Sequence, residues 1–281
     1  MGVGKIGGEV AYLSSVMGIA DEIQIYDCNP SLLQAQKLDL IHTGINVKIS
    51  ADNNDIRDSD IILFSAGLPR NPAIKRRADL LESNLVVAEQ FCEKIKGFKG
   101  VVICVTNPMD AISYYVSQNA DIDRKKCIGF GGQLDLARFE CFLKLRGINP
   151  KNSFVIGEHG EYQVPVFSEI ADEVIPKVRE EILLEMRGAS MPIISGKGGT
   201  VFGPAYNIIN LIRAVSENKK EILPCSCTLE GEYELSELSI GVPAIIGKNG
   251  IERIIERDLD SWEEKKFKEA AEHLKDLCSK V

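Results

Sequence analysis

Two short motifs near the middle of the chain combine residue types that can move a proton on an acidic molecule. The first is Leu134-Asp135-Leu136-Ala137-Arg138, and the second is Gly157-Glu158-His159-Gly160. If the first segment is helical, Asp135 and Arg138 share one face, because they are three residues apart. The carboxylate could then orient an imidazole, and the guanidinium could bind an anion. His159 is one of only three histidines in 281 residues, which makes it the candidate for the proton transfer.

These residues also have ordinary structural interpretations, which the sequence leaves open. Asp135 and Arg138 could form an exposed ion pair on a helix, and His159 could be a surface residue of a loop. The chemistry therefore depends on the fold bringing residues 135, 138 and 159 together.

A glycine-rich segment at the start of the chain is typical of a dinucleotide site. Gly2-Val3-Gly4-Lys5-Ile6-Gly7 precedes a predicted helix over 9–17, and Asp27, twenty residues after Gly7, ends the next predicted strand. Glycines let the backbone approach a pyrophosphate, and the helix N-terminus attracts its charge. Asp27 would bind ribose hydroxyls and repel a 2′-phosphate, which favours NAD over NADP. The alternative is a helix start with flexible glycines and no ligand.

The composition excludes several functional classes. Hydrophobic residues make up 44% of the chain, charged residues 26%, and the net charge is −8, as in an ordinary globular protein. The acidic balance and the lack of a basic stripe argue against nucleic-acid binding. No run approaches the roughly 18 apolar residues of a membrane span. No charged-then-apolar leader precedes the glycine motif, so we expect a cytoplasmic protein.

The eight cysteines are scattered, mostly in apolar segments, and we expect buried free thiols. Cys225-Ser226-Cys227 is the one close pair. It has no further ligand type nearby in the sequence, so no metal site is predicted.

The first half of the chain alternates apolar runs with amphipathic stretches, which is the βαβ pattern of a parallel sheet. Strands are predicted over 22–27, 60–66, 101–105 and 126–130. Helices are predicted over 31–41, 78–96 and 110–118.

The second half has a different pattern. It predicts helices over 133–146, 203–217 and 262–279, and strands over 153–157, 222–229 and 238–246, with a turn at 230–232. Polar, irregular sequence extends from the strand at 153–157 to about residue 190. The prediction is an α/β fold with two domains: a Rossmann-type doubly wound parallel sheet in residues 1–124 and an α+β substrate domain in residues 125–281.

One strand of the expected sheet is missing. A dinucleotide-binding glycine motif should follow an apolar strand, but here it follows Met1 directly. In the usual strand order 3-2-1-4-5-6 the absent strand is central, so two strands would keep unpaired backbone groups. Either the natural start lies upstream, or the protein tolerates an interrupted sheet, and cofactor affinity is the property most affected.

Taken together, these motifs resemble the NAD-dependent lactate and malate dehydrogenases, particularly the archaeal malate dehydrogenases. No single motif is specific, but the ordered set is. Beyond the glycine motif, the similar segments are Ala66-Gly67-Leu68-Pro69-Arg70-Asn71-Pro72, Arg77-Ala78-Asp79-Leu80 with Asn84, Val105-Thr106-Asn107-Pro108-Met109-Asp110, Leu134-Asp135 with Arg138-Phe139, Ile156-Gly157-Glu158-His159-Gly160, Lys197-Gly198-Gly199-Thr200 and Ile240-Gly241-Val242-Pro243.

The resemblance implies a role for each motif. His159 would be the general acid and base, Asp135 would orient it, and Arg138 would bind the C1 carboxylate of a 2-hydroxy acid. Further substrate contacts would come from Arg70, Arg76, Arg77, Asn107 and Thr200. The residues that would contact NAD are Gly2, Gly4, Lys5, Ile6, Gly7, Asp27, Ala66, Gly67, Asn84, Val105 and Asn107. Two ordinary alternatives remain, a turn signal at Asn107-Pro108 and a helix cap at Thr200.

Within the resembled family, arginine at position 70 implies malate and oxaloacetate, whereas glutamine would imply lactate. A second carboxylate needs a cation in a dry pocket, and an arginine facing a methyl group would be uncompensated. The loop that follows would supply a catalytic arginine. Counting forward from Arg70 gives Arg76, and counting back from Asp79 gives Arg77, which we favour.

Three other functions stay open at this point: a lactate or broader 2-hydroxy-acid dehydrogenase, a non-catalytic nucleotide-binding protein, and an NAD- and metal-dependent glycosidase. The last would need a suitably placed cysteine and histidine and a longer chain. The resemblance also implies a homo-oligomer, dimer or tetramer, with contacts expected from the helices at 9–17 and 133–146.

Overall fold

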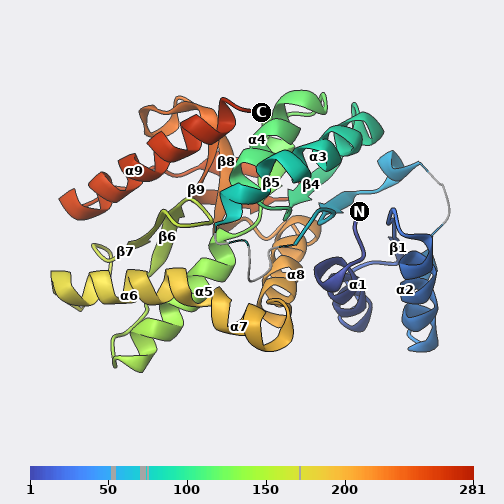
Figure 1. Cartoon of the computed structure of the whole chain (residues 1–281), viewed down its shortest axis with the longest axis horizontal. Helices are drawn as coiled ribbons and strands as arrows, with labels where there is room; N and C mark the ends of the chain where they lie inside the picture. The colour runs from blue at the N-terminus through green and yellow to red at the C-terminus, as the bar shows by residue number, and fades with distance from the viewer. Residues whose placement is uncertain (52–54, 70–73, 75, 171) are drawn as a thin grey trace.

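A computed structural model describes residues 1–51, 55–69, 74, 76–170 and 172–281. The N-terminal elements lie at one end of the molecule, and the helices α6 (Pro176–Gly188) and α9 (Ser261–Cys278) lie at the other (Figure 1). Within these residues, no helix is long and apolar enough to cross a membrane.

The elements alternate between strands and helices up to the middle of the chain, as predicted. They are α1 (Lys5–Val16), β1 (Glu22–Gln24), α2 (Pro30–His42), β2 (Lys48–Ser50), η1 (Ile56–Asp58), β3 (Ile61–Phe64), η2 (Arg77–Leu80), α3 (Leu81–Ile95), β4 (Val101–Cys104), α4 (Met109–Asn119), η3 (Arg124–Lys126) and β5 (Cys127–Gly129).

The second half begins with a helix and is richer in antiparallel strands. Besides α6 and α9, it contains α5 (Gly132–Leu145), β6 (Phe154–Gly157), β7 (Gln163–Val166), α7 (Ser190–Lys197), α8 (Phe202–Ser216), β8 (Glu221–Glu230), η4 (Glu232–Glu234), β9 (Ser236–Gly247) and β10 (Gly250–Ile254).

The main sheet has eight strands among the described residues and runs through both halves of the chain. Its order is β3-β4-β5-β8-β9-β6-β7, and β10 also pairs with β9. The pairs β3–β4 and β4–β5 are parallel, whereas the later pairs are antiparallel. Single register pairs, Gly129 with Ser226 and Gly157 with Gly241, join β5 to β8 and β6 to β9. The segments that contain Asp135 and His159 therefore follow β5 and β6, which are strands of one sheet.

The predicted interruption of the sheet is present. Strands β1 and β2 form a separate parallel pair, and β3 has only β4 as a strand partner among the described residues. Met1 lies between the two sheets: its nitrogen donates to the Leu63 carbonyl at 3.0 Å, and its carbonyl accepts from Ser65 N–H at 2.9 Å. A cavity of about 450 Å³ occupies the rest of the gap, lined by β1, β3 and α1.

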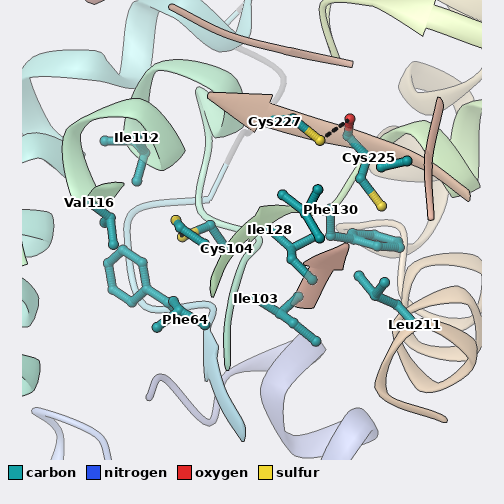
Figure 2. Close-up of a cluster of buried hydrophobic side chains, with 14 of the residues drawn as sticks. Phe64, Ile103, Cys104, Ile112, Val116, Ile128, Phe130, Leu211, Cys225 and Cys227 are labelled. Atoms are coloured by element: carbon teal, nitrogen blue, oxygen red, sulfur yellow. Dashed lines mark hydrogen bonds between the residues drawn. The ribbon is translucent and has the colours of Figure 1, made fainter. Parts of the chain in front are cut away.

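Buried apolar side chains on both faces of the main sheet form one large core. Phe64, Ile103 and Ile128 project from the adjacent strands β3, β4 and β5, and Ile112 and Val116 of α4 belong to the same core (Figure 2). Such burial provides the main favourable free energy of folding. This core fixes the strand ends from which the site loops emerge.

Several details differ from the sequence-based predictions. The segment predicted as irregular between the strand at 153–157 and residue 190 contains β7 and α6. The elements α7, β2 and β10 were also not predicted. The sequence did not predict β7 because this strand contains Pro165, and proline is rare inside paired strands. The expectation of mostly buried cysteines holds for six residues, whereas Cys28 and Cys141 are exposed.

Candidate active site

The two central motifs meet through a hydrogen bond between His159 and Asp135. His159 follows β6, and its Nδ1 lies 2.6 Å from Oδ2 of Asp135 on α5. Oδ1 of Asp135 accepts from Nη1 of Arg138, one helical turn later, at 3.1 Å. The side chains of Asp135, Arg138 and His159 are 2%, 11% and 9% exposed, so this is not a surface ion pair. An acceptor on Nδ1 fixes the ring orientation and directs Nε2 to proton transfer.

Glycine residues make room for this arrangement. A Cβ atom on Gly131, at the start of α5, would lie 2.3 Å from Cγ of His159. Gly157 has φ +89°, a conformation that disfavours other residues, and it turns the chain from β6 into the histidine loop. The glycines around His159 therefore allow the ring to pack against the first turn of α5.

A second carboxyl group, not predicted as a site residue, also contacts His159. Oδ2 of Asp110, in the first turn of α4, accepts the backbone N–H of His159 at 2.8 Å. Burial is the main cause that raises the pKa of Asp110 to about 7; Ser226 and the His159 N–H lower it, and Glu158 and Asp135 raise it. In the sequence, Asp110 stands out only as the last residue of the motif around Asn107, and this position does not predict its contact with His159.

Glu158 lies on the other side of the histidine loop and is also buried. Its Oε2 accepts the backbone N–H groups of Glu161 and Tyr162, both at 3.0 Å. Its Oε1 is 3.7 Å from Nε2 of His273 on α9. These contacts close the loop on itself and connect it to the C-terminal helix.

The glycine motif has the geometry of a dinucleotide turn. Gly2 has φ +86°, and a Cβ on Gly7 would lie 1.9 Å from the Gly2 carbonyl oxygen, so the turn requires both glycines. Beyond Gly4 there is open space, and no described side chain caps the first turn of α1. Unsatisfied N–H groups at an open helix start suit a pyrophosphate. The residues present therefore fit a bound dinucleotide.

Asp27 closes the same turn from three residues beyond β1, because this strand ends at Gln24 and not at Asp27 as predicted. Its Oδ2 accepts Val3 N–H and its Oδ1 accepts Asn29 N–H, both at 2.9 Å. A carboxylate oxygen can accept more than one hydrogen bond, so ribose hydroxyls remain possible donors. Ile6 of α1 is half-buried and packs on the main core.

Asn84 brings together the cofactor segments after β3 and β4. It is fully buried in α3; its Oδ1 accepts Leu68 N–H at 2.7 Å, and its Nδ2 donates to the Asn107 carbonyl at 2.6 Å. Gly67, next to Ala66, has no room for a Cβ, which would lie 2.7 Å from Thr106. Val105 N–H donates to the Phe64 carbonyl at 2.9 Å.

The side chain of Asn107 has an oxygen that is available to a ligand. This Oδ1 is buried and has no protein partner among the described residues, as expected for a ligand-binding group.

The segment that contains Thr200 lies against the glycine motif. Lys5 Nζ donates to the Gly198 carbonyl at 2.8 Å, and Thr200 is half-buried. Val201, not Thr200, is the N-cap residue of α8, so the cap interpretation of Thr200 is wrong.

The loop arginines are only partly described. Arg70 lies outside the described residues, and Arg77 is described only by its backbone at the start of η2. Arg76 has a side chain that is 67% exposed, and its Nη2 pairs with Asp79 at 2.9 Å. Its guanidinium therefore has a carboxylate partner within its own loop, and the choice of Arg77 as the arginine for substrate stays a prediction.

Family models and known proteins match the whole chain. A model described as lactate/malate dehydrogenase, NAD binding domain, matches residues 1–129, and one described as lactate/malate dehydrogenase, alpha/beta C-terminal domain, matches residues 132–281. A malate dehydrogenase of Pelagibacter ubique is 34% identical over 302 residues, covering 99% of this chain and 94% of the relative. An L-lactate dehydrogenase of Bacillus caldotenax is 32% identical over 303 residues, covering 100% and 95%.

A solved structure gives the same similarity in three dimensions. The malate dehydrogenase of Archaeoglobus fulgidus in complex with NADH has a TM-score of 0.89 and 30% identity, covering 99% of this chain and 97% of that one.

Proposed function

Because this chain belongs to the lactate/malate dehydrogenase family, we propose that it is a malate dehydrogenase, which interconverts (S)-malate and oxaloacetate. It has an NAD-binding domain, and its class is that of an NAD-dependent 2-hydroxyacid dehydrogenase. The choice of malate over lactate is the proposal. The contact of His159 with Asp135, beside Arg138, is the observation that supports the dehydrogenase chemistry. The presence of arginine at position 70 is the reason for choosing malate as the substrate.

Bound NAD supplies the acceptor for the hydride that leaves C2 during oxidation. Neutral His159 takes the hydroxyl proton through Nε2 as the hydride departs, and in reduction it starts protonated. Asp135 keeps the ring in one tautomer and stabilises the imidazolium. Burial of this pair excludes water and strengthens both effects.

Arginines bind the substrate's charges in this proposal. Arg138, held by Asp135, binds the C1 carboxylate, Arg70 binds the C4 carboxylate, and Arg77 polarises the reacting carbonyl. Asn107, whose amide oxygen is buried, and Thr200 line the same pocket. A lactate substrate would leave Arg70 without an anion, which is costly in a dry site.

The test is NADH oxidation with oxaloacetate or pyruvate at equal concentrations. We expect kcat/KM to be at least about 100-fold higher for oxaloacetate, since a buried unpaired arginine costs several kcal/mol. Arg70→Gln should lower the preference for oxaloacetate by a similar factor. Equal rates with both substrates would show a broader 2-hydroxyacid dehydrogenase, and a higher rate with pyruvate would show a lactate dehydrogenase.

We also propose that the protein works in the cytoplasm as a homodimer or homotetramer, with a dinucleotide-binding domain in residues 1–124 and a substrate and catalytic domain in residues 125–281. Exposed apolar side chains support an oligomer. Tyr12 and Val16 of α1 and Phe202 and Tyr206 of α8 are 42–68% exposed, and the two helices pack together. Apolar patches of this kind are typical of subunit interfaces.

A further inference from the structure

The loop that carries His159 is the tip of a hairpin, and the C-terminal helix packs along this hairpin. Strands β6 and β7 form an antiparallel pair, and residues 158–162 connect them. The helix α9 packs against both strands. The mechanism proposed above uses no residue of α9, so the contacts of this helix show what else holds the histidine loop in place.

The first turn of α9 is fixed to the base of the hairpin. Glu263 is fully buried there, and its Oε1 accepts the backbone N–H groups of Phe167 and Ser168 at 2.7 and 2.8 Å. From Glu263 to His273 the helix advances about 15 Å. From Phe167 back to Tyr162 an extended chain covers a similar length, about 17 Å. The spacing therefore brings His273 to the tip when Glu263 is at the base.

At the tip, the imidazole of His273 contacts both ends of the histidine loop. Its Nε2 lies 3.7 Å from Oε1 of Glu158, the residue directly before His159. Its ring stacks on the ring of Tyr162, with the centroids 4.5 Å apart and an angle of 25° between the planes. One side chain of α9 therefore holds the residues on either side of His159.

The carboxylate of Glu158 transmits this contact to the backbone of the loop. The side chain of Glu158 is 5% exposed, and its Oε2 accepts the N–H groups of Glu161 and Tyr162, both at 3.0 Å. A Cβ atom on Gly160 would lie 2.1 Å from Oε1, so the carboxylate also packs directly against the residue after His159. A displaced carboxylate would thus move the backbone on both sides of His159.

We propose that His273 is a positioning residue for the proton-transfer histidine. By pairing with Glu158 and stacking on Tyr162, it keeps the loop in the conformation in which Nδ1 of His159 meets Asp135 and Nε2 is left for the substrate. It acts through the loop and not on the reacting atoms. This role rests on the proposed function, whereas the contact itself can be measured without turnover.

Two substitutions separate the pairing from the stacking. Phenylalanine at position 273 keeps a ring that can stack on Tyr162 but has no group for the carboxylate. Arginine at the same position offers both interactions, because a guanidinium pairs with carboxylates and also stacks on aromatic rings. Lys275→Gln removes an exposed positive charge from the same helix and serves as the matched control.

The first test measures the contact by urea unfolding. The variants are Glu158→Gln, His273→Phe and the two changes together, since glutamine keeps an acceptor for the N–H groups of the loop. If the side chains interact, the two losses do not add. The unfolding equilibrium constant of the double variant should then be about fivefold smaller than the single effects predict when multiplied. Losses that add would overturn the pairing.

The second test measures steady-state kinetics with whichever of oxaloacetate and pyruvate the wild type prefers, and active sites are counted by NADH fluorescence titration. His273→Phe should lower kcat about tenfold, because a displaced loop misaligns the proton transfer. The KM values for the 2-oxo acid and NADH should stay within about twofold, since no arginine of the site changes. His273→Arg should recover most of the lost kcat, and Lys275→Gln should equal the wild type.

The kinetic outcomes separate positioning from a merely structural role. A structural role would lower the number of active sites and leave kcat per site unchanged, which would overturn the proposal. It would also be overturned if His273→Arg were no faster than His273→Phe. If the wild type turns over neither oxaloacetate nor pyruvate, the proposed function fails, while the unfolding measurements still decide whether α9 holds the loop through His273.

Discussion

The nitrogen atoms of His159 have different tasks under the proposed function. Nδ1 is bound to Asp135 at 2.6 Å, so Nε2 must exchange the proton with substrate. Asparagine at this position keeps a polar side chain of similar reach but cannot gain and lose a proton near neutral pH.

His159→Asn should therefore lower kcat by about 1,000-fold in both directions, because general acid–base groups contribute 10²–10⁴-fold. NADH binding, followed by its fluorescence, should stay within about twofold of the wild type, since the groups that would hold the pyrophosphate and ribose are the glycine turn and Asp27. His42→Asn in the last turn of α2 is the control. Rates close to the wild type would exclude the mechanism.

The two arginines that begin η2 can be separated by experiment. Arg76 is ion-paired with Asp79 on the surface, and exposed pairs contribute about 0–1 kcal/mol to stability. Arg76→Gln should therefore change kcat by less than about threefold. Arg77→Gln should lower kcat about 100-fold or more, because it removes a charge from the reacting carbonyl. Steady-state kinetics of both variants decide between them, and a collapse of kcat in Arg76→Gln alone would reverse the assignment.

At the residue scale, the sequence predicted that Asp135 would orient His159, and the structure has this contact. The pairing of Asp135 with Arg138 was considered only as an exposed ion pair, and the structure has the pair but buries it. Motif spacing was sufficient because the two groups on α5 are separated by one turn. The contact of Asp110 with His159 could not be predicted, because it depends on how closely α4 approaches the loop after β6. The catalytic roles themselves remain predictions.

At the scale of elements, the gap between β1 and β3 limits the N-terminal half. Alternation along a parallel strand directs the backbone groups of Ile61 and Leu63 toward the gap, since Asp60 and Phe64 bond toward β4. Met1 already bonds to Leu63 and Ser65 in this direction. An extended segment that leads into Met1 could continue the same ladder.

Adding four valine and isoleucine residues before Met1 should therefore stabilise the protein. We expect the free energy of unfolding to rise by about 3 kcal/mol or more, from new backbone hydrogen bonds and apolar burial in the cavity. Urea denaturation measures this change, and NADH titration should show tighter binding because the glycine turn is held more firmly. A Gly-Ser extension of equal length is the control. Equal stability of the two extended chains would show that the cavity does not accept a strand.

The elements that the sequence predicted best have strong apolar patterns: a continuous apolar run in β4 and helical periodicity in α5 and α9. Those that it missed have weak local signals. β2 has three residues, and among the described strands it pairs only with β1. In α6, only Ile182, Leu183 and Met186 are buried, so the apolar face of this helix is short. Their positions are determined by tertiary packing, which no short window of sequence contains.

At the scale of the whole molecule, the apolar residues on α1 and α8 predict self-association. The wild type should run at a multiple of 30.9 kDa in light scattering. Val16→Glu with Phe202→Glu should shift it toward 30.9 kDa, because two charges would be buried in the interface. Leu184→Glu on the exposed face of α6 is the control. A wild-type protein of 30.9 kDa would contradict the prediction.

The separate pair of β1 and β2 makes one corner of the molecule its weakest point. This corner has its own small core of Val3, Ala11, Ile25 and Leu40, apart from the large one. Units with few buried contacts open before the rest of a protein does. Amide protons of β1 and α2 should thus exchange with deuterated solvent faster than those of β4 and β9. A dinucleotide bound to both the glycine turn and Asp27 would stabilise the folded form of this corner. Weaker cofactor binding and faster local unfolding would then both report the same equilibrium, between the folded and the locally unfolded corner.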